Sequence, residues 1–83
     1  TLICMDVLEH IEPLEIEETV KALASLSNHA LIGIANHSDK WRGVQLHLIQ
    51  QGSLWWESLL SRYYHSISSL YQSKRFFVFE VKS

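Results

Sequence analysis

The sequence predicts an α/β fold in which two parallel strands are followed by a C-terminal antiparallel hairpin, with helices on the faces of the sheet. Two short, continuous apolar runs, Leu2–Met5 and residues 30–35, are typical of strands that are buried on both faces. A helix-length segment separates the two runs, so the strands are expected to be parallel neighbours. Two later strand-like segments are joined by only a few residues, and such a short connection requires antiparallel pairing.

Each remaining element follows from a local pattern. The connecting helix is expected over residues 13–27, because proline suits the first helical turn and acidic residues crowd the early turns. Residues 36–51 are polar and have no clear hydrophobic period, so no helix or strand is assigned to them. A second helix is expected over residues 54–62, after a Gly-Ser pair that offers an N-cap. The hairpin is expected to join residues 66–71 to residues 75–82.

Composition and charge limit the possible functions. The 83 residues suffice for one small domain, and a formal net charge of −2 gives no basic field to hold a nucleic-acid backbone. No apolar stretch approaches the roughly 20 residues that a membrane-spanning helix needs. The single cysteine, Cys4, lies in an apolar run, which favours a reducing, cytoplasmic compartment. The chain begins with Thr1, so we expect residues 1–83 to be one partial domain of a longer protein.

Polar side chains follow both predicted parallel strands at the point where each strand ends. Asp6, Glu9 and His10 come after the first strand, and Asn36 and His37 come after the second. Ligands of open parallel sheets bind beyond the carboxyl ends of the strands. The sequence therefore predicts a ligand site on this rim of the sheet.

Four segments in order carry a resemblance to a known family: ICMDVLEHIEP, ALIGIANH, LHLIQQGSLWWESLL and RFFVFEVK. Together they resemble the C-terminal half of a class I S-adenosylmethionine-dependent methyltransferase, from its fourth to its seventh strand. The resemblance implies a partial Rossmann-like sheet and a methyl transfer from S-adenosylmethionine to an acceptor that the sequence does not identify. The family's Gly-rich cofactor loop has no counterpart here, because the three glycines form no G-x-G arrangement. The resemblance thus implies an incomplete cofactor site and a chain that is inactive by itself.

The resemblance also implies three groups of site residues. The methionine end of the cofactor would lie against the turn after the first strand, at Met5, Asp6 and Val7. The acceptor side would be formed by Glu9, Asn36 and Trp55. The groups that orient or deprotonate the acceptor would be three histidines, His10, His37 and His47.

A metal site is a further alternative for part of this set. Asp6, Glu9, His10 and His47 resemble the acidic and histidine ligands of small-RNA 2′-O-methyltransferases, whose segment reads E-x-x-E-H. Carboxylate and imidazole ligands could hold Mg²⁺, Mn²⁺ or Zn²⁺. The first glutamate of that segment is Asp6 here, and the E-H pair also occurs in methyltransferases without a metal. The sequence therefore assigns no metal and leaves the use of a divalent cation open.

Two functions of other classes compete with the methyltransferase hypothesis. The first alternative is a non-catalytic half-domain, because the first strand would lack the sheet neighbour that it has in the family. Its exposed edge would then favour self-association into a homo-oligomer, or binding of a protein partner or a missing N-terminal half. A small α/β hydrolase that uses histidine and aspartate ranks last, since no G-x-S-x-G motif is present.

Overall fold

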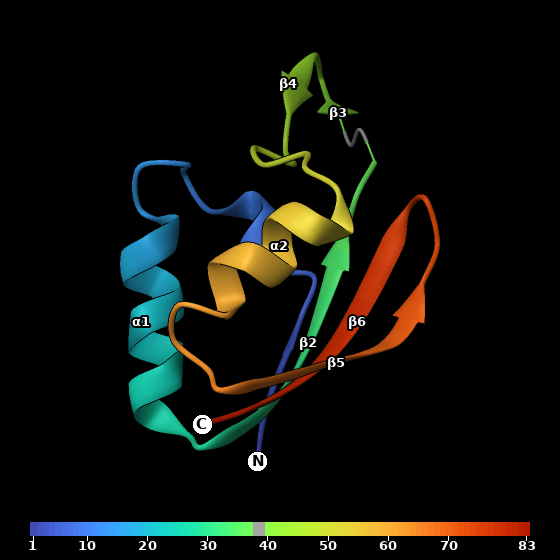
Figure 1. Ribbon diagram of the computed structural model, residues 1–83. Coiled ribbons are helices and arrows are strands. Elements are labelled where there is room, and N and C mark those ends of the chain that lie inside the picture. Colours follow the sequence, from blue (N-terminus) through green and yellow to red (C-terminus); the bar gives the residue numbers. More distant parts are fainter. Residues whose placement is uncertain (38–39) are drawn as a thin grey trace.

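Four strands form one open sheet in the computed structural model, which describes residues 1–37 and 40–83 (Figure 1). The strands are β1 (Leu2–Met5), β2 (His29–Ala35), β5 (Ser66–Gln72) and β6 (Phe76–Lys82), and their order across the sheet is β1-β2-β6-β5. β1 and β2 are parallel, whereas the other two pairs are antiparallel. The expected parallel pair and the expected hairpin are both confirmed, and the fold is a small mixed α/β domain.

The helices are shorter than the sequence predicts. Helix α1 spans Ile16–Leu26 and helix α2 spans Ser53–Leu60, and a short 3₁₀ helix, η1, spans Leu8–His10. α1 begins late because the side chain of Leu14 is 99% exposed, so the expected first turn has no apolar contact to hold it. In the described part of the chain, neither helix has the length and apolarity that crossing a membrane requires.

One face of the sheet carries the hydrophobic core. Every second residue of the strands points to this face, and the buried ones are Cys4, Ala30, Ile32, Ile34, Phe77, Phe79 and Val81. Both helices pack on the same face, α1 through Ile16 and Val20 and α2 through Trp56 and Leu60 (Figure 1). The sequence predicts helices on the faces of the sheet, and the structure has both of them on one face.

The opposite face of β1 is correspondingly open. Ile3 is 67% exposed and Met5 is 38% exposed, so the expectation that β1 is buried on both faces is wrong. The physical reason is that α1, which connects β1 to β2, and the later helix α2 lie on one side of the sheet. A continuous apolar run cannot distinguish a strand covered on both faces from one whose second face is left open.

The two edges of the sheet differ in character. β5 forms one edge, where serines dominate its sequence and a register shift between Ser69 and Tyr71 interrupts the pairing with β6. Polar residues and bulges protect an edge strand from pairing with another chain. β1 forms the other edge with four apolar residues and a regular register against β2.

A small hairpin occupies part of the segment that the sequence left unassigned. β3 (Lys40–Trp41) pairs with β4 (Val44–Gln45), and the residues between them, Arg42 and Gly43, have φ angles of 51° and 81°. Positive φ angles at both positions are typical of the tight turns that join two-residue hairpins. Figure 1 shows this hairpin extending beyond the carboxyl end of β2.

His29 links two strands at the opposite end of the sheet. Its Nε2 lies 2.8 Å from Glu80 Oε2, and its Nδ1 lies 2.8 Å from Thr1 Oγ1. The hydrogen bond from His29 lowers the pKa of Glu80 below its ordinary value of 4.5. Because the pKa is lowered by folding, this contribution to stability is present above about pH 4.5 and is lost as the pH falls through the lowered value.

We therefore expect Glu80→Gln to remove a pH-dependent part of the stability. In urea unfolding at decreasing pH, the stability of the unmodified chain should fall relative to that of Glu80→Gln as the Glu80 carboxylate becomes protonated. Glu18→Gln, at an exposed site on α1, serves as the control and should keep the pH dependence of the original chain. Identical pH profiles for the chain and Glu80→Gln would contradict the coupling.

Candidate metal centre

The turn after β1 brings an acidic side chain into the protein. Asp6 adopts a left-handed conformation with φ of 56°, which aspartate tolerates better than most residues, and its backbone N–H donates to Gly33 O at 3.0 Å. The chain then enters η1, where Leu8 and Glu9 are both fully buried. Leu8 packs in the core and so anchors η1, which leaves the next residue, Glu9, pointing into the rim.

The carboxylate of Glu9 is buried without a hydrogen bond. Among the described residues, neither of its oxygens has a hydrogen-bond partner, and the ring nitrogen His10 Nε2 lies 3.9 Å from Oε2. That distance exceeds a hydrogen bond. A buried charge is costly unless it is paired or coordinates a metal. Burial of the Glu9 carboxylate therefore lowers the stability of the fold. A positively charged ligand would offset this loss.

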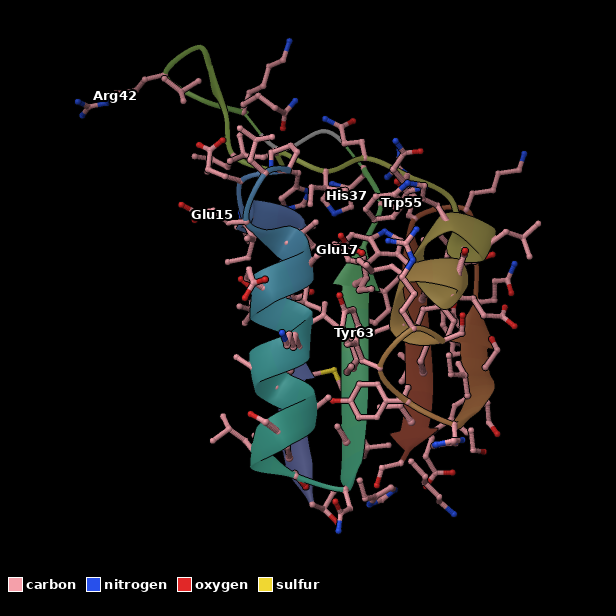
Figure 2. The ribbon with its side chains drawn as sticks, turned by 60° about the vertical axis from the view of Figure 1, so that its left-hand side comes forward. Glu15, Glu17, His37, Arg42, Trp55 and Tyr63 are labelled. Atoms are coloured by element: carbon pink, nitrogen blue, oxygen red, sulfur yellow. The ribbon has the colours of Figure 1, made fainter. Side chains whose placement is uncertain are left out.

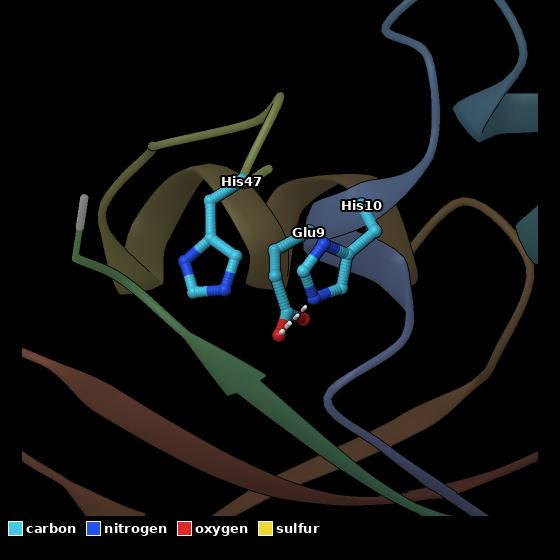
Figure 3. A group of neighbouring side chains, drawn as sticks. All are labelled: Glu9, His10 and His47. Carbon is cyan, nitrogen blue, oxygen red and sulfur yellow. Dashed lines mark ion pairs between the residues drawn. The ribbon is translucent and has the colours of Figure 1, made fainter. Parts of the chain in front are cut away.

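Two histidines face this carboxylate with a defined ring orientation. His10 Nδ1 lies 2.7 Å from Leu46 O, and His47 Nδ1 lies 2.7 Å from His37 O. A carbonyl oxygen only accepts, so both Nδ1 atoms donate, and in a neutral ring the lone pair is then on Nε2. Figure 3 shows one ring on each side of the Glu9 carboxylate, with a ring nitrogen of each turned toward it. The ring centroids of His10 and His47 are 4.6 Å apart.

This arrangement fits a divalent cation. One ligand atom from each of Glu9, His10 and His47 lies within 4.8 Å of the others. Tetrahedral ligands at about 2.0–2.2 Å from one zinc ion lie about 3.3–3.6 Å apart, so side-chain rotations that move the ligand atoms by about an ångström would bring the set into range. Histidines that bind metals commonly donate their second N–H to a backbone carbonyl, as both do here. Two imidazoles with one carboxylate suit Zn²⁺ or Mn²⁺ better than Mg²⁺, which prefers oxygen ligands.

A pocket of about 430 Å³ opens beside the three ligand side chains. Its walls come from the ends of β1 and β2, the start of β6 and the segment that returns at His47, and its lining residues are Asp6, Glu9, His10, Ala35, His37, His47 and Phe76. This volume is within the range of small-molecule sites. The pocket therefore has room for part of a substrate next to a bound cation.

The structure brings five of the predicted site residues to this pocket and leaves four outside its walls. Those in the pocket are Asp6, Glu9, His10, His37 and His47. Asp6 lines the pocket but is not part of the three-residue ligand group. The rings of His37 and His47 lie 4.8 Å apart, so His37 stands next to the ligand group.

The other predicted residues have different surroundings. Met5 and Val7 are 38% and 46% exposed. The backbone N–H of Asn36 donates to Arg75 O at 2.6 Å, and its side chain lines a neighbouring pocket over the β5–β6 turn. Trp55 packs edge-on against Trp56 at 4.9 Å and faces α1 from the start of α2 (Figure 2). None of these four side chains lines the pocket beside Glu9.

Sequence reasoning missed the backbone groups that support the site. The carbonyls of Leu46 and His37 orient the two histidines, and the Ile49 N–H donates to Glu9 O at 3.1 Å. Backbone acceptors are the same at every residue, so no sequence signal could identify them. Ser38 and Asp39, which also follow the second predicted strand and belong to the predicted rim, lie outside the described residues.

Cys4, on β1 below the rim, is a core residue. It is 8% exposed, and burial, followed by the nearby charge of Glu9, raises the pKa of its thiol. A thiol with a raised pKa is a poor nucleophile. The site therefore offers carboxylate and imidazole chemistry.

Comparisons of the chain with protein-family models, with curated proteins and with solved structures find no match.

Proposed function

We propose that this chain binds a divalent cation through Glu9, His10 and His47. The observation that carries the proposal is the Glu9 carboxylate, which is fully buried, has no hydrogen bond and faces two histidines of fixed orientation. A cation bound there would compensate the charge of the Glu9 carboxylate and satisfy its oxygens.

We further propose that the cation site is the acceptor side of a S-adenosylmethionine-dependent methyltransferase, of which this chain is the C-terminal portion. The resemblance of the four sequence segments supports this function. So does the location of the pocket at the carboxyl ends of a parallel strand pair, where ligands of such sheets bind. A Rossmann-like parent sheet and a cytoplasmic location stay predictions.

In that reaction the residues of this chain would position the acceptor. A bound cation would supply Lewis-acid stabilisation of an acceptor oxygen. With His10 and His47 serving as ligands, His37 is the remaining pocket histidine that could orient the acceptor or take its proton. Most of the rate would come from holding the acceptor in line with the methyl group. The cofactor site in this chain is incomplete, so we expect no measurable binding of S-adenosylmethionine to it alone.

A second candidate function is association through the β1 edge. The observation that favours it is an unprotected apolar edge strand whose Ile3 side chain is 67% exposed. A second copy of the chain or a separate N-terminal half could pair with this edge. Light scattering coupled to size exclusion should then show a species larger than the monomer, and a monomer at all concentrations would contradict self-association.

Isothermal calorimetry tests cation binding directly. We expect Zn²⁺ to bind with one-to-one stoichiometry, Mn²⁺ more weakly and Mg²⁺ more weakly still, following the donor set. Glu9→Gln keeps the size of the side chain but removes its charge, and should weaken Zn²⁺ binding at least about tenfold. The matched control is Glu12→Gln, at an exposed position three residues on, which should bind as the original chain does. Equal affinity in Glu9→Gln and Glu12→Gln would overturn the proposed site.

A further inference from the structure

We infer that the cation site also fastens a neighbouring arm of the chain, so that cation binding holds this arm against the rim. The arm is defined as residues 40–47, which comprise the β3–β4 hairpin and the return to His47. The inference rests on the proposed function, because it requires a cation at Glu9, His10 and His47.

Two hydrogen bonds from the ligand histidines fix the base of the arm. His10 on η1 donates to Leu46 O, and His47 donates to His37 O at the end of β2. Both donors are Nδ1 atoms, whereas the other ring nitrogens face Glu9. Each imidazole therefore joins the ligand site on one side to the base of the arm on the other.

The described side chains of the arm lie mostly at the surface. Val44 is 58% exposed and Leu46 is 37% exposed, and Arg42 projects from the tip of the hairpin, away from the sheet (Figure 2). Among the arm residues whose burial is described, only His47 is buried, and it is 4% exposed. Segments with few buried apolar contacts open locally at a low free-energy cost.

Both histidine bonds should become stronger when the Nε2 atoms hold a cation. Coordination draws electron density from the imidazole, which makes its N–H a better donor, and a carbonyl on that N–H in turn improves the ligand. The coupling is reciprocal, so a closed arm raises cation affinity by the same factor by which the cation favours closure. Closure of the arm against the rim therefore depends on the bound cation.

Hydrogen exchange of the whole chain, followed by NMR with and without Zn²⁺, tests this coupling. The amides of residues 44–47 report opening of the arm, whereas the amide of Ile32, in the central strand β2, reports global unfolding. At Zn²⁺ about 100 times its Kd, we expect exchange in the arm to slow at least about tenfold, with about 100-fold as the limit if the open arm cannot bind. Glu9→Gln should show no such slowing.

The two sets of amides distinguish failure of the coupling between cation and arm from failure of the cation site itself. Slower exchange at Ile32 with unchanged exchange at residues 44–47 would show that the cation binds without fastening the arm, which overturns this inference alone. Unchanged exchange at both would overturn the cation site as well. Slowing at residues 44–47 in Glu9→Gln too would show that Zn²⁺ acts on the arm from another position, which also contradicts the inference.

Discussion

Glu9→Gln should have opposite effects on stability in the absence and in the presence of a cation. Without cation the variant should be as stable as the original chain or more stable, because it removes a buried charge that has no hydrogen bond. With Zn²⁺ at about 100 times its Kd, the original chain should gain about 2.7 kcal/mol. For a domain of this size, that gain corresponds to a rise in Tm of roughly 10–20 °C. Glu9→Gln should gain little under the same conditions.

Thermal unfolding by circular dichroism, with and without Zn²⁺, measures both effects. Glu12→Gln is the control, because it removes one acidic charge from the same region at an exposed position. It should keep the full rise in Tm with Zn²⁺. If Glu9→Gln destabilises the cation-free chain by several kcal/mol, the carboxylate stabilises the cation-free fold, and the description of Glu9 as a buried charge with a net energetic cost is incorrect.

Trp56→Ala should cause the largest loss of stability of any substitution in the helices. Trp56 is fully buried on α2 and packs in the core cluster above the sheet. Truncating a buried tryptophan costs about 3–5 kcal/mol, which is a large share of the roughly 5–15 kcal/mol that stabilise a typical domain. Urea denaturation should therefore show a midpoint near zero denaturant or a chain that is unfolded from the start.

The neighbouring tryptophan provides the matched control. Trp55 is 37% exposed, so Trp55→Ala should cost about 1 kcal/mol, chiefly through its edge-on contact with Trp56. Trp56→Phe should cost much less than Trp56→Ala, because the indole N–H of Trp56 has no hydrogen-bond partner to lose. Similar losses for Trp55→Ala and Trp56→Ala would contradict the observed orientation of α2.

The sequence predicted the elements of the fold well because local patterns determine them. The two apolar runs became β1 and β2, the connecting segment became α1, and the short turn before Phe76 required the antiparallel hairpin. What it could not predict was which side of the sheet each helix covers. That depends on the packing of α1 and α2 against one face, and the exposed side chain of Ile3 is the result.

The candidate site was predictable only in part, for a similar reason. The position of Glu9 and His10 after a parallel strand placed them on the rim, and the structure brings His37 to the same pocket. His47 lies in the segment left unassigned, so only the family resemblance pointed to it. The burial of Glu9 without a hydrogen bond from the described residues depends on the way η1 docks through Leu8, and no local pattern reveals it.

The most direct test of the cation site is a crystal structure of the chain grown with Zn²⁺, with anomalous data collected at the zinc absorption edge. We expect one strong anomalous peak at the rim, about 2.0–2.2 Å from a carboxylate oxygen of Glu9 and from the Nε2 atoms of His10 and His47. A peak that involves only surface histidines such as His65, with the Glu9 carboxylate left without a ligand, would contradict the account.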